Sequence, residues 1–374
     1  MISKDLFGGV FQNKRIFVTG HTGFQGSWLT LWLKSLGAKV IGYSLSPPTK
    51  PSLFEILQLK KDIIHILGDV RDQSFLQKCL IKHKPDIVFH LAAQPLVRLS
   101  YEKPVDTFHT NIMGTVNLLE AIKNTQSVKA GIIITSDKCY ENKEWTFAYR
   151  ENDPLGGFDP YSASKGATEI ITSSYSRSFF HLDNKNRKTG IATVRAGNVI
   201  GGGDWAQDRI VPDCMRSVYS RKPILIRNPK SIRPWQHVLE PISGMLLLAS
   251  KLWNEPHSYN EPWNFGPNLS ANVTVKELVI QIIKESKQKA NWKDMSKNTK
   301  NAVHEANFLQ LDSTKASNLL GWRQTYSIKE TISETASWYQ NYVNKTEMRK
   351  FTVSQIEKYI EKAKHMNAAW IANK

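Results

Sequence analysis

Tyr161 and Lys165 form the pair of side chains in this chain that is best suited to proton transfer. Their spacing of four residues puts both on one face of a helix. An ammonium beside a phenol favours the phenolate, so we expect the tyrosine pKa to fall from about 10 towards neutrality. Asp159 and Pro160 have the residue types of a helix N-cap and first helical position. The alternative is a chance Y-x-x-x-K on a helix surface.

A glycine motif near the N-terminus predicts a site for a dinucleotide cofactor. Gly20, Gly23 and Gly26 follow the apolar run 16–19 directly and precede an amphipathic stretch. In a strand, turn and helix, this spacing lets backbone N–H groups approach a pyrophosphate, and a purely structural glycine turn is the alternative. The second predicted strand ends at 41–44 with neither an acid nor an arginine, so these residues leave NAD and NADP undecided.

A second group of polar side chains follows the fifth predicted strand. Ser136, Asp137 and Lys138 supply a hydroxyl, a carboxyl and an amine in three consecutive positions. Because the carboxyl ends of parallel strands face the ligand crevice of an open α/β sheet, these groups could supply hydrogen-bonding, acid and base functions there. A strand-end turn with Asp137 as a helix cap is the alternative.

The second half of the chain carries polar residues suited to an anionic substrate. Arginines can form forked hydrogen bonds with phosphates, which fits a diphosphate, although each could equally make an ordinary surface ion pair. The candidates are Asn198, Arg209, Arg233 and His237. His237 could instead be a buried structural histidine, and its neighbours show no metal-ligand spacing, so we predict no metal site.

The elements that must position these residues alternate between short apolar runs and amphipathic stretches from residue 15 to about 200. This pattern predicts an α/β fold with a doubly wound, parallel, Rossmann-type sheet and a smaller C-terminal substrate-binding lobe. The predicted strands are 15–19, 39–43, 63–67, 87–91, 131–135 and 191–195. We expect a cofactor domain at 1–200, a substrate lobe at 201–345 that the chain can cross into and out of, and a helical extension at 346–374. A terminal helix is predicted at 352–364, started by Thr352 or Ser354.

Composition narrows the classes of protein that fit. The chain has 374 residues, of which 41% are hydrophobic and 22% charged, as in ordinary globular proteins. No run approaches the roughly 20 apolar residues that span a bilayer, and the N-terminus lacks a signal-peptide pattern, so we expect a cytoplasmic protein without membrane contact. Three widely spaced cysteines suggest neither a disulfide framework nor a zinc site.

The net charge of +17 raises the question of nucleic-acid binding. The lysines are scattered rather than gathered in one stripe with interleaved aromatics. We therefore favour solvated surfaces that attract an anionic small substrate, and we expect no nucleic-acid partner.

Taken together, these motifs resemble the extended short-chain dehydrogenase/reductase superfamily and its NAD-dependent epimerase/dehydratase family. The resemblance covers nearly the whole chain and includes Asp69-Val70, Ala92-Ala93 and the block 111–115. It implies that NAD is bound by Gly20, Thr22, Gly23, Phe24, Gly26, Asp69, Val70, Ala92, Ala93, Asn111, Tyr161 and Lys165. Asp69 would then lie against the adenine amino group.

More narrowly, the chain is similar to the CDP-glucose 4,6-dehydratases. The matching blocks are 18–24, 51–55, 135–142, 156–161, 201–205 and 233–238. The resemblance implies tightly held NAD, CDP-glucose as substrate, and a homodimer or dimer of dimers built through helices that include the Tyr161 helix. It also implies deoxysugar biosynthesis, such as that of lipopolysaccharide O-antigen, and contacts from Asn198, Arg209 and Arg233 to the nucleotide diphosphate.

The same resemblance implies roles for the catalytic residues. Tyr161, kept anionic by Lys165, would take the proton of the sugar 4-hydroxyl while Ser136 hydrogen-bonds that oxygen. Asp137 would protonate the departing 6-hydroxyl. Related dTDP-glucose dehydratases use a glutamate as C5 base where this chain has Lys138, so the C5 base stays open between Lys138 and another group. A 4-epimerase, a dehydratase of another nucleotide sugar and a catalytically silent binding protein are the competing hypotheses.

Overall fold

The computed structural model describes residues 2–180, 189–268, 271–296 and 308–371. Its centre is a seven-stranded parallel sheet with the order β11-β6-β5-β4-β1-β2-β3, which confirms the predicted doubly wound class. The strands are β1 (Arg15–Thr19), β2 (Lys39–Ser44), β3 (Ile64–Leu67), β4 (Ile87–His90), β5 (Ala130–Ile134), β6 (Gly190–Arg195) and β11 (Pro262–Asn264). The six predicted strands are all present, and β11 was not predicted because three residues carry too little periodicity.

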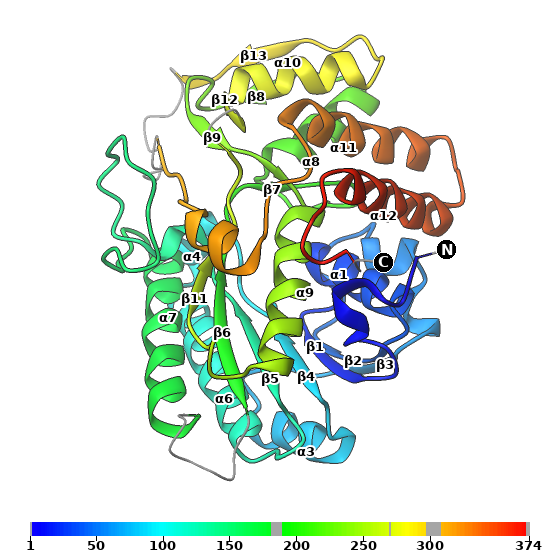
Figure 1. Cartoon of the computed structure of the whole chain (residues 1–374). Helices are drawn as coiled ribbons and strands as arrows, with labels where there is room; N and C mark the ends of the chain where they lie inside the picture. The colour runs from blue at the N-terminus through cyan, green and yellow to red at the C-terminus, as the bar shows by residue number, and fades with distance from the viewer. Residues whose placement is uncertain (1, 181–188, 269–270, 297–307, 372–374) are drawn as a thin grey trace.

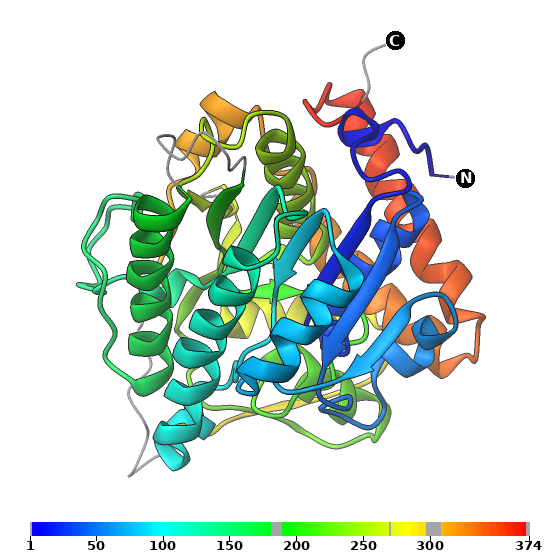
Figure 2. The ribbon, with the colours of Figure 1, turned by 90° about the horizontal axis from the view of Figure 1, so that it is seen from below.

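Helices cover both faces of the sheet, because successive strand side chains point to opposite sides. Phe17 packs with one group of apolar side chains, whereas its neighbours Ile16 and Val18 pack with the other. The helices α3 (Gln73–His83), α6 (Gly114–Lys123) and α7 (Pro160–Phe179) pack side by side over one face (Figure 2), and α1 (Phe24–Ser35) and α9 (Leu239–Asn254) lie on the other.

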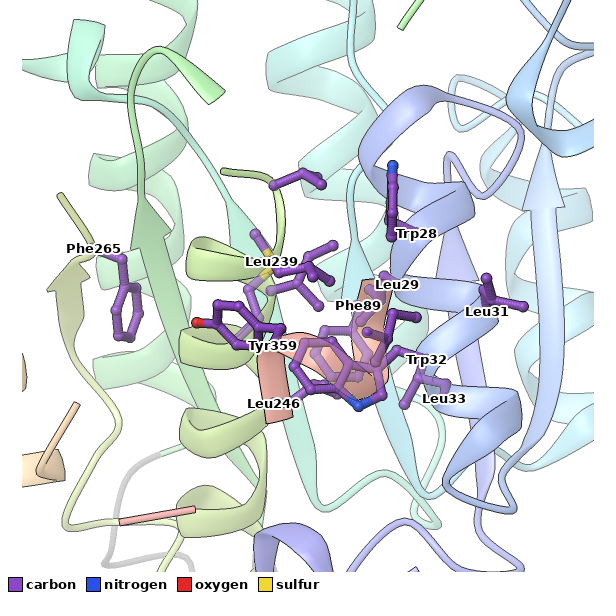
Figure 3. Close-up of a cluster of buried hydrophobic side chains, with 14 of the residues drawn as sticks. Trp28, Leu29, Leu31, Trp32, Leu33, Phe89, Leu239, Leu246, Phe265 and Tyr359 are labelled. Carbon is purple, nitrogen blue, oxygen red and sulfur yellow. The ribbon is translucent and has the colours of Figure 1, made fainter. Parts of the chain in front are cut away.

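The larger hydrophobic core joins segments that are far apart in the chain. In Figure 3, Trp32 of α1 lies near Leu246 of α9 and Tyr359, which is in the terminal helix α12 (Met348–His365), and Trp28 belongs to the same core nearer the start of α1. Trp370 stacks on the Tyr359 ring with centroids 6.0 Å apart. The C-terminal segment therefore packs directly behind the helix that follows the glycine motif.

The start predicted for the terminal helix was wrong. The helix begins at Met348 rather than near Thr352, and Thr352 lies inside it. The Thr352 hydroxyl donates a hydrogen bond to the Met348 carbonyl and accepts one from Trp338 Nε1 at 2.9 Å. Its hydroxyl thus serves a contact with another helix, which a sequence pattern for capping does not reveal.

A smaller part of the molecule lies beyond the carboxyl ends of the large sheet, at the top of Figure 1. It contains three two-stranded sheets and the helices α8 (Ile210–Tyr219) and α10 (Val275–Glu285). Its strands are β7 (Val199–Ile200), β8 (Ile224–Ile226), β9 (Ile232–Pro234), β10 (Gln236–His237), β12 (Asn272–Thr274) and β13 (Trp292–Asp294). Between them, α9 and β11 return to the large sheet, so the chain crosses between the two parts.

Short helices and one further long helix complete the described ranges. The helix α11 (Ile328–Val343) begins with a capping box between Ser327 and Glu330 and packs against α12. The short segments are η1 (Leu6–Gly9), α2 (Leu53–Ile56), η2 (Leu59–Lys61), α4 (Val97–Glu102), α5 (Pro104–Phe108), η3 (His109–Met113), η4 (Asp137–Cys139) and η7 (Ala316–Leu320). None of the helices in the described ranges combines the length and apolar character needed to span a membrane.

Candidate active site

The glycine motif forms the tight turn between β1 and α1. Gly20 has a φ of +73°, and a Cβ there would lie 2.7 Å from the backbone nitrogen of Ala92. A Cβ on Gly26 would lie 2.2 Å from the Gly20 carbonyl oxygen. Gly23 is the N-cap of α1, whose first turn carries no acidic residue. The turn therefore presents an uncharged helix N-terminus at which backbone N–H groups can meet a pyrophosphate.

We expect Gly26→Ala to destabilise the protein by about 1–3 kcal/mol, because the new methyl group meets fixed backbone rather than a movable side chain. Gly23→Ala is the matched control, since its Cβ would lie 3.4 Å from its nearest neighbour, the Gly20 carbonyl oxygen. Thermal unfolding of the two variants measures the difference. Equal melting temperatures would contradict the close approach of Gly26 to the turn.

The residues around the end of β2 and β3 are engaged with one another. Thr22 Oγ1 lies 2.8 Å from Ser44 Oγ and donates to the Leu45 carbonyl, at the strand end where an acidic residue is absent. The Asp69 carboxylate is paired with Arg71, with Nη2 and Oδ2 2.6 Å apart, and this ion pair lowers the pKa of Asp69. Asp69 thus lies after β3 as predicted, but its carboxylate faces Arg71.

Some of the predicted cofactor residues near β4 and α6 hydrogen-bond to neighbouring segments, and others pack in a hydrophobic core. Asn111 accepts a hydrogen bond from the Gln94 N–H at 2.8 Å and donates one to Ser164 Oγ at 2.8 Å, so it ties the segment after β4 to α7. Ala92, and with it the neighbouring Ala93, lies in that segment, where the Ala92 N–H donates to Thr19 Oγ1. The side chain of Val70 is buried in the smaller core, and Phe24, the first residue of α1, packs against the larger one.

The end of β5 carries a buried hydroxyl and carboxyl. Ser136 caps η4 and donates a hydrogen bond to Asp137 Oδ1 at 2.8 Å. Asp137 is only 4% exposed, and burial raises its pKa, opposed by the nearby charges of Lys138 and Arg233. A Cβ on Gly197 would lie 2.1 Å from Asp137 Oδ2. Burial therefore favours a proton on Asp137, as an acid catalyst requires.

Tyr161 and Lys165 lie on the first turns of α7, after the predicted N-cap Asp159 and Pro160. Both side chains are buried, and the Lys165 ammonium donates a hydrogen bond to the Ile134 carbonyl at 3.2 Å. Burial raises the pKa of Tyr161 to about 12, although a hydrogen bond with Ser136 and the charge of Arg209 oppose the rise. The predicted fall of the tyrosine pKa is therefore wrong for this structure, since burial outweighs the favourable charges.

The pKa of Lys165 shifts in the opposite direction from that of Tyr161, because burial lowers it to about 8. The carboxylate of Glu169 opposes that fall. A lysine with this pKa carries its charge through neutral pH and loses it in the mildly alkaline range. The hydrogen bond with Ser136 joins Tyr161 to the end of β5, so hydroxyl, carboxyl, phenol and ammonium gather between β5 and α7.

Two of the predicted substrate residues, both arginines, shift the pKa values of the catalytic side chains through their positive charge. Arg209 precedes α8, pairs with Asp204 at 2.9 Å, and acts on the Tyr161 pKa. Arg233 lies on β9 and acts on the Asp137 pKa. Asn198 lies between β6 and β7 with a φ of +42°, and its carbonyl accepts a hydrogen bond from the N–H of Gln236, the first residue of β10, at 3.2 Å. Positive charge from the smaller part of the molecule thus borders the catalytic group.

His237 lies in the core and not at this site. Its side chain is fully buried, packs between the rings of Trp28 and Tyr326, and accepts a hydrogen bond from the Leu239 N–H. Burial lowers its pKa to about 3, so the ring is neutral. We therefore correct the substrate assignment of His237 in favour of the structural alternative. No cluster of His, Cys, Asp and Glu that could hold a metal occurs among the described residues.

Sequence reasoning missed a buried acid and base next to the catalytic group. Glu169 lies on α7 four residues after Lys165, and it pairs with Arg195 at 2.8 Å. The spacing of 161, 165 and 169 puts all three on one helix face, which was a usable signal. The partner Arg195, at the end of β6, had no sequence signal that linked it to α7.

Comparison with known proteins gives three findings. The family model described as GDP-mannose 4,6 dehydratase matches residues 17–335. The chain is 48% identical over 361 residues to the CDP-glucose 4,6-dehydratase of Salmonella typhimurium, covering 96% of this chain and 99% of that protein. It is 24% identical to the dTDP-glucose 4,6-dehydratase of Xanthomonas campestris strain ATCC 33913, covering 86% and 92%.

Two solved structures share the fold. The UDP-glucose 4-epimerase of Thermotoga maritima, solved with UDP-glucose, has a TM-score of 0.74 at 22% identity and covers 88% of this chain and 99% of its own. The dTDP-glucose 4,6-dehydratase of Streptomyces venezuelae, solved with NAD and TYD, has a TM-score of 0.73 at 20% identity and covers 89% and 99%.

Proposed function

Because the chain belongs to the GDP-mannose 4,6-dehydratase family, we propose that it is an NAD-dependent lyase that converts CDP-glucose to CDP-4-keto-6-deoxyglucose and water. The observation that carries the proposal is the 48% identity, across 96% of the chain, to a CDP-glucose 4,6-dehydratase. The proposed selectivity for a cytidine nucleotide rests on the similarity to this relative. We assign it to no particular side-chain contact. The geometry adds that an acid and a phenol, both buried, stand beside each other as a dehydration through a 4-ketone requires.

The glycine turn supports the assignment of NAD as cofactor. Cβ atoms on Gly20 and Gly26 would clash with the backbone around Ala92 and Gly20, so these glycines keep the turn tight, and the α1 N-terminus bears no opposing charge. Bound NAD would supply hydride transfer and the positive charge of its oxidised ring, and would end each turnover oxidised again. Thr22 and Ser44 offer hydroxyls rather than a carboxylate at the end of β2, so the ribose is held without an acidic partner at that strand end.

Tyr161 is the base for the first step in this proposal. Its phenolate has to form against the raised pKa of Tyr161. Once formed, it removes the proton of the sugar 4-hydroxyl as the C4 hydride departs, and Ser136 hydrogen-bonds the same oxygen. The charge of Arg209 favours this phenolate, and we assign the same task to the Lys165 ammonium, one turn further along α7. Positive charges near the phenol would offset part of the cost of a buried anion.

Asp137 is the acid for the second step. The 4-ketone acidifies the C5 proton, and Asp137 protonates the 6-hydroxyl so that it leaves as water. Burial raises the pKa of Asp137, which is the direction of shift that an acid catalyst needs. Lys138 is the candidate for the C5 base that the same strand end supplies. Solvent deuterium incorporation at C5 in Lys138→Ala, compared with the unmodified protein, tests that part of the assignment.

Arg209, Arg233 and Asn198 form the proposed contact with the nucleotide diphosphate. They come from loops and strands beyond the sheet, and the two arginines already act on the pKa values of Tyr161 and Asp137. A diphosphate bound there would place its sugar towards these catalytic side chains.

The test of the function is incubation of purified protein with CDP-, dTDP-, UDP- and GDP-hexoses without added cofactor, followed by mass spectrometry. We expect CDP-glucose to lose one water and the other sugars to remain largely unchanged. No conversion of CDP-glucose, even with NAD supplied, would overturn the proposal. Conversion of another sugar instead would keep the reaction and replace the substrate.

A homodimer is part of the proposal. The segment α5 to η3, beside α7, exposes apolar side chains around a hollow of about 320 Å³, with Val105 77% exposed and Phe108 and Met113 also exposed. A second copy is the occupant we infer, since the resemblance points to pairing through the Tyr161 helix. Sedimentation should show a dimer that Val105→Asp dissociates and Leu225→Asp, exposed elsewhere on β8, does not; a monomer at all concentrations would contradict it.

We place the protein in the cytoplasm in this proposal. Cys79, Cys139 and Cys214 are all free and buried, which fits a compartment that keeps thiols reduced.

A further inference from the structure

The carboxylate of Glu169 is buried on the helix that carries the catalytic phenol and ammonium. Glu169 is 3% exposed and lies one turn after Lys165 and two turns after Tyr161, on the same face of α7. A carboxylate in this position is costly unless hydrogen bonds and a counter-charge compensate it. The proposed mechanism assigns it no task.

Glu169 joins α7 to the ends of two strands. One carboxylate oxygen accepts a hydrogen bond from Thr135 Oγ1, and the other accepts from Thr193 Oγ1 at 2.7 Å and from Arg195 Nη2 at 2.8 Å. Thr135 immediately precedes Ser136, the first residue of the polar group at the end of β5. The same carboxylate therefore fixes the helix of Tyr161 and Lys165 against the segment that holds Ser136 and Asp137.

Arg195 is the counter-charge, and it is held independently of Glu169. It is 2% exposed, and its Nη1 donates to Tyr140 Oη at 2.7 Å and to the Glu151 carbonyl at 2.9 Å. Tyr140 in turn donates to Asn264 on β11. The guanidinium is thus anchored from the far side by Tyr140 and the Glu151 carbonyl, and it pairs with Glu169 without a contact to Lys165.

The titratable groups that face the Lys165 ammonium come from three elements, which are α7, η4 and β4. Glu169 on its own helix and the Cys139 thiol of η4 raise its pKa, while burial lowers it. From β4, His90 faces it as a neutral ring, because burial and the charge of Lys165 lower the His90 pKa to about 3. Glu169 is the carboxylate in this set, and it opposes the fall of the Lys165 pKa more than the Cys139 thiol does.

We propose that Glu169, compensated by Arg195, is a positioning residue that keeps the Lys165 ammonium charged and holds the Tyr161 helix in register with Ser136 and Asp137. This inference rests on the roles proposed above for Tyr161 and Lys165. It assigns to the buried Glu169–Arg195 pair a function in the reaction, beyond its contribution to the stability of the fold.

The direct test measures Lys165 itself, with no substrate present. In the full-length protein, the ζ-nitrogen resonance of Lys165, identified by its loss in Lys165→Met, is followed by NMR against pH. We expect a midpoint near pH 8 in the unmodified protein. In Glu169→Gln the midpoint should fall by about one pH unit, because a nearby opposite charge is lost. An unchanged midpoint would overturn the proposal, whether or not CDP-glucose is the substrate.

The kinetic test uses the same variants with CDP-glucose. Ammonium charge is present below the Lys165 pKa and lost above it, so Glu169→Gln should move the alkaline limb of kcat to lower pH by about one unit. Glu169→Asp keeps the charge and should keep the limb. A loss of the same factor at every pH would indicate a merely structural role and contradict the inference.

Two further variants keep the test decisive. Glu169→Gln leaves Arg195 buried without its counter-charge, so the double variant Glu169→Gln with Arg195→Met removes both charges. Its Lys165 midpoint should still fall, but by less than in Glu169→Gln, because a positive charge is lost as well. Glu120→Gln is the matched control, since Glu120 accepts a hydrogen bond from Tyr175 near the other end of α7. Its Lys165 midpoint and alkaline limb should stay where they are in the unmodified protein.

Discussion

Tyr161→Phe is expected to lower the kcat for dehydration of CDP-glucose by ~10²–10⁴, the usual contribution of a positioned general base. The substitution removes only the phenolic oxygen and leaves the buried ring in place. Without that oxygen, no described side chain on α7 can take the proton of the 4-hydroxyl at the same position. Hydride transfer then leaves a protonated ketone, which is why the loss should appear before any water is released.

The measurement is single-turnover formation of reduced nicotinamide together with water loss by mass spectrometry. Both should fall by the same factor in Tyr161→Phe. Tyr175→Phe is the control, because it removes a phenolic oxygen from the same helix but one that contacts Glu120. Near-normal turnover of Tyr161→Phe would exclude the proposed base and leave Ser136 as the residue to examine.

The parts of the site that sequence could predict are those whose chemistry is local. The turn of Gly20, Gly23 and Gly26 is specified within seven residues, because a strand, a helix and their close approach are all encoded there. The cap at Asp159 and the face shared by Tyr161 and Lys165 follow from helical spacing in the same way. Strands β1 to β6 were found because each is an apolar run bounded by polar turns.

The parts that could not be predicted depend on contacts between distant segments. The ionisation of Tyr161 is set by burial beneath elements that the sequence does not place, so spacing alone gave the wrong direction for its pKa. His237 looked like a polar residue among arginines, yet β10 pairs with β7 and carries it into the core. Arg195 meets Glu169 only because β6 lies beside β5.

The two buried acids near the site differ in what surrounds them, and this difference assigns their tasks. Glu169 is paired with the Arg195 guanidinium at 2.8 Å. Asp137 has a hydroxyl at 2.8 Å, and burial raises its pKa more than Lys138 and Arg233 lower it. An acid catalyst must give up a proton, so Asp137 fits that task and Glu169 does not.

Asp137→Asn is expected to lower kcat by ~10²–10⁴ at a later step than Tyr161→Phe does. The amide keeps the size of the side chain but cannot protonate the 6-hydroxyl, whereas Tyr161 still removes the 4-hydroxyl proton. Reduced nicotinamide should therefore build up with CDP-glucose while water loss stalls. Asp86→Asn is the control, because Asp86 lies just before β4, at the amino ends of the strands, where it accepts a hydrogen bond from the Arg15 N–H. It should neither accumulate reduced nicotinamide nor slow water loss.

The pH dependence separates the acid role from a purely electrostatic one. Because burial raises the Asp137 pKa, the proton is present below that pKa and is lost as pH rises through it. The rate of water loss in the unmodified protein should therefore fall as the pH rises through the Asp137 pKa. The residual activity of Asp137→Asn should show no such fall. If the variant lost oxidation and water release together, Asp137 would act on Tyr161 through its charge rather than as the acid for the leaving hydroxyl.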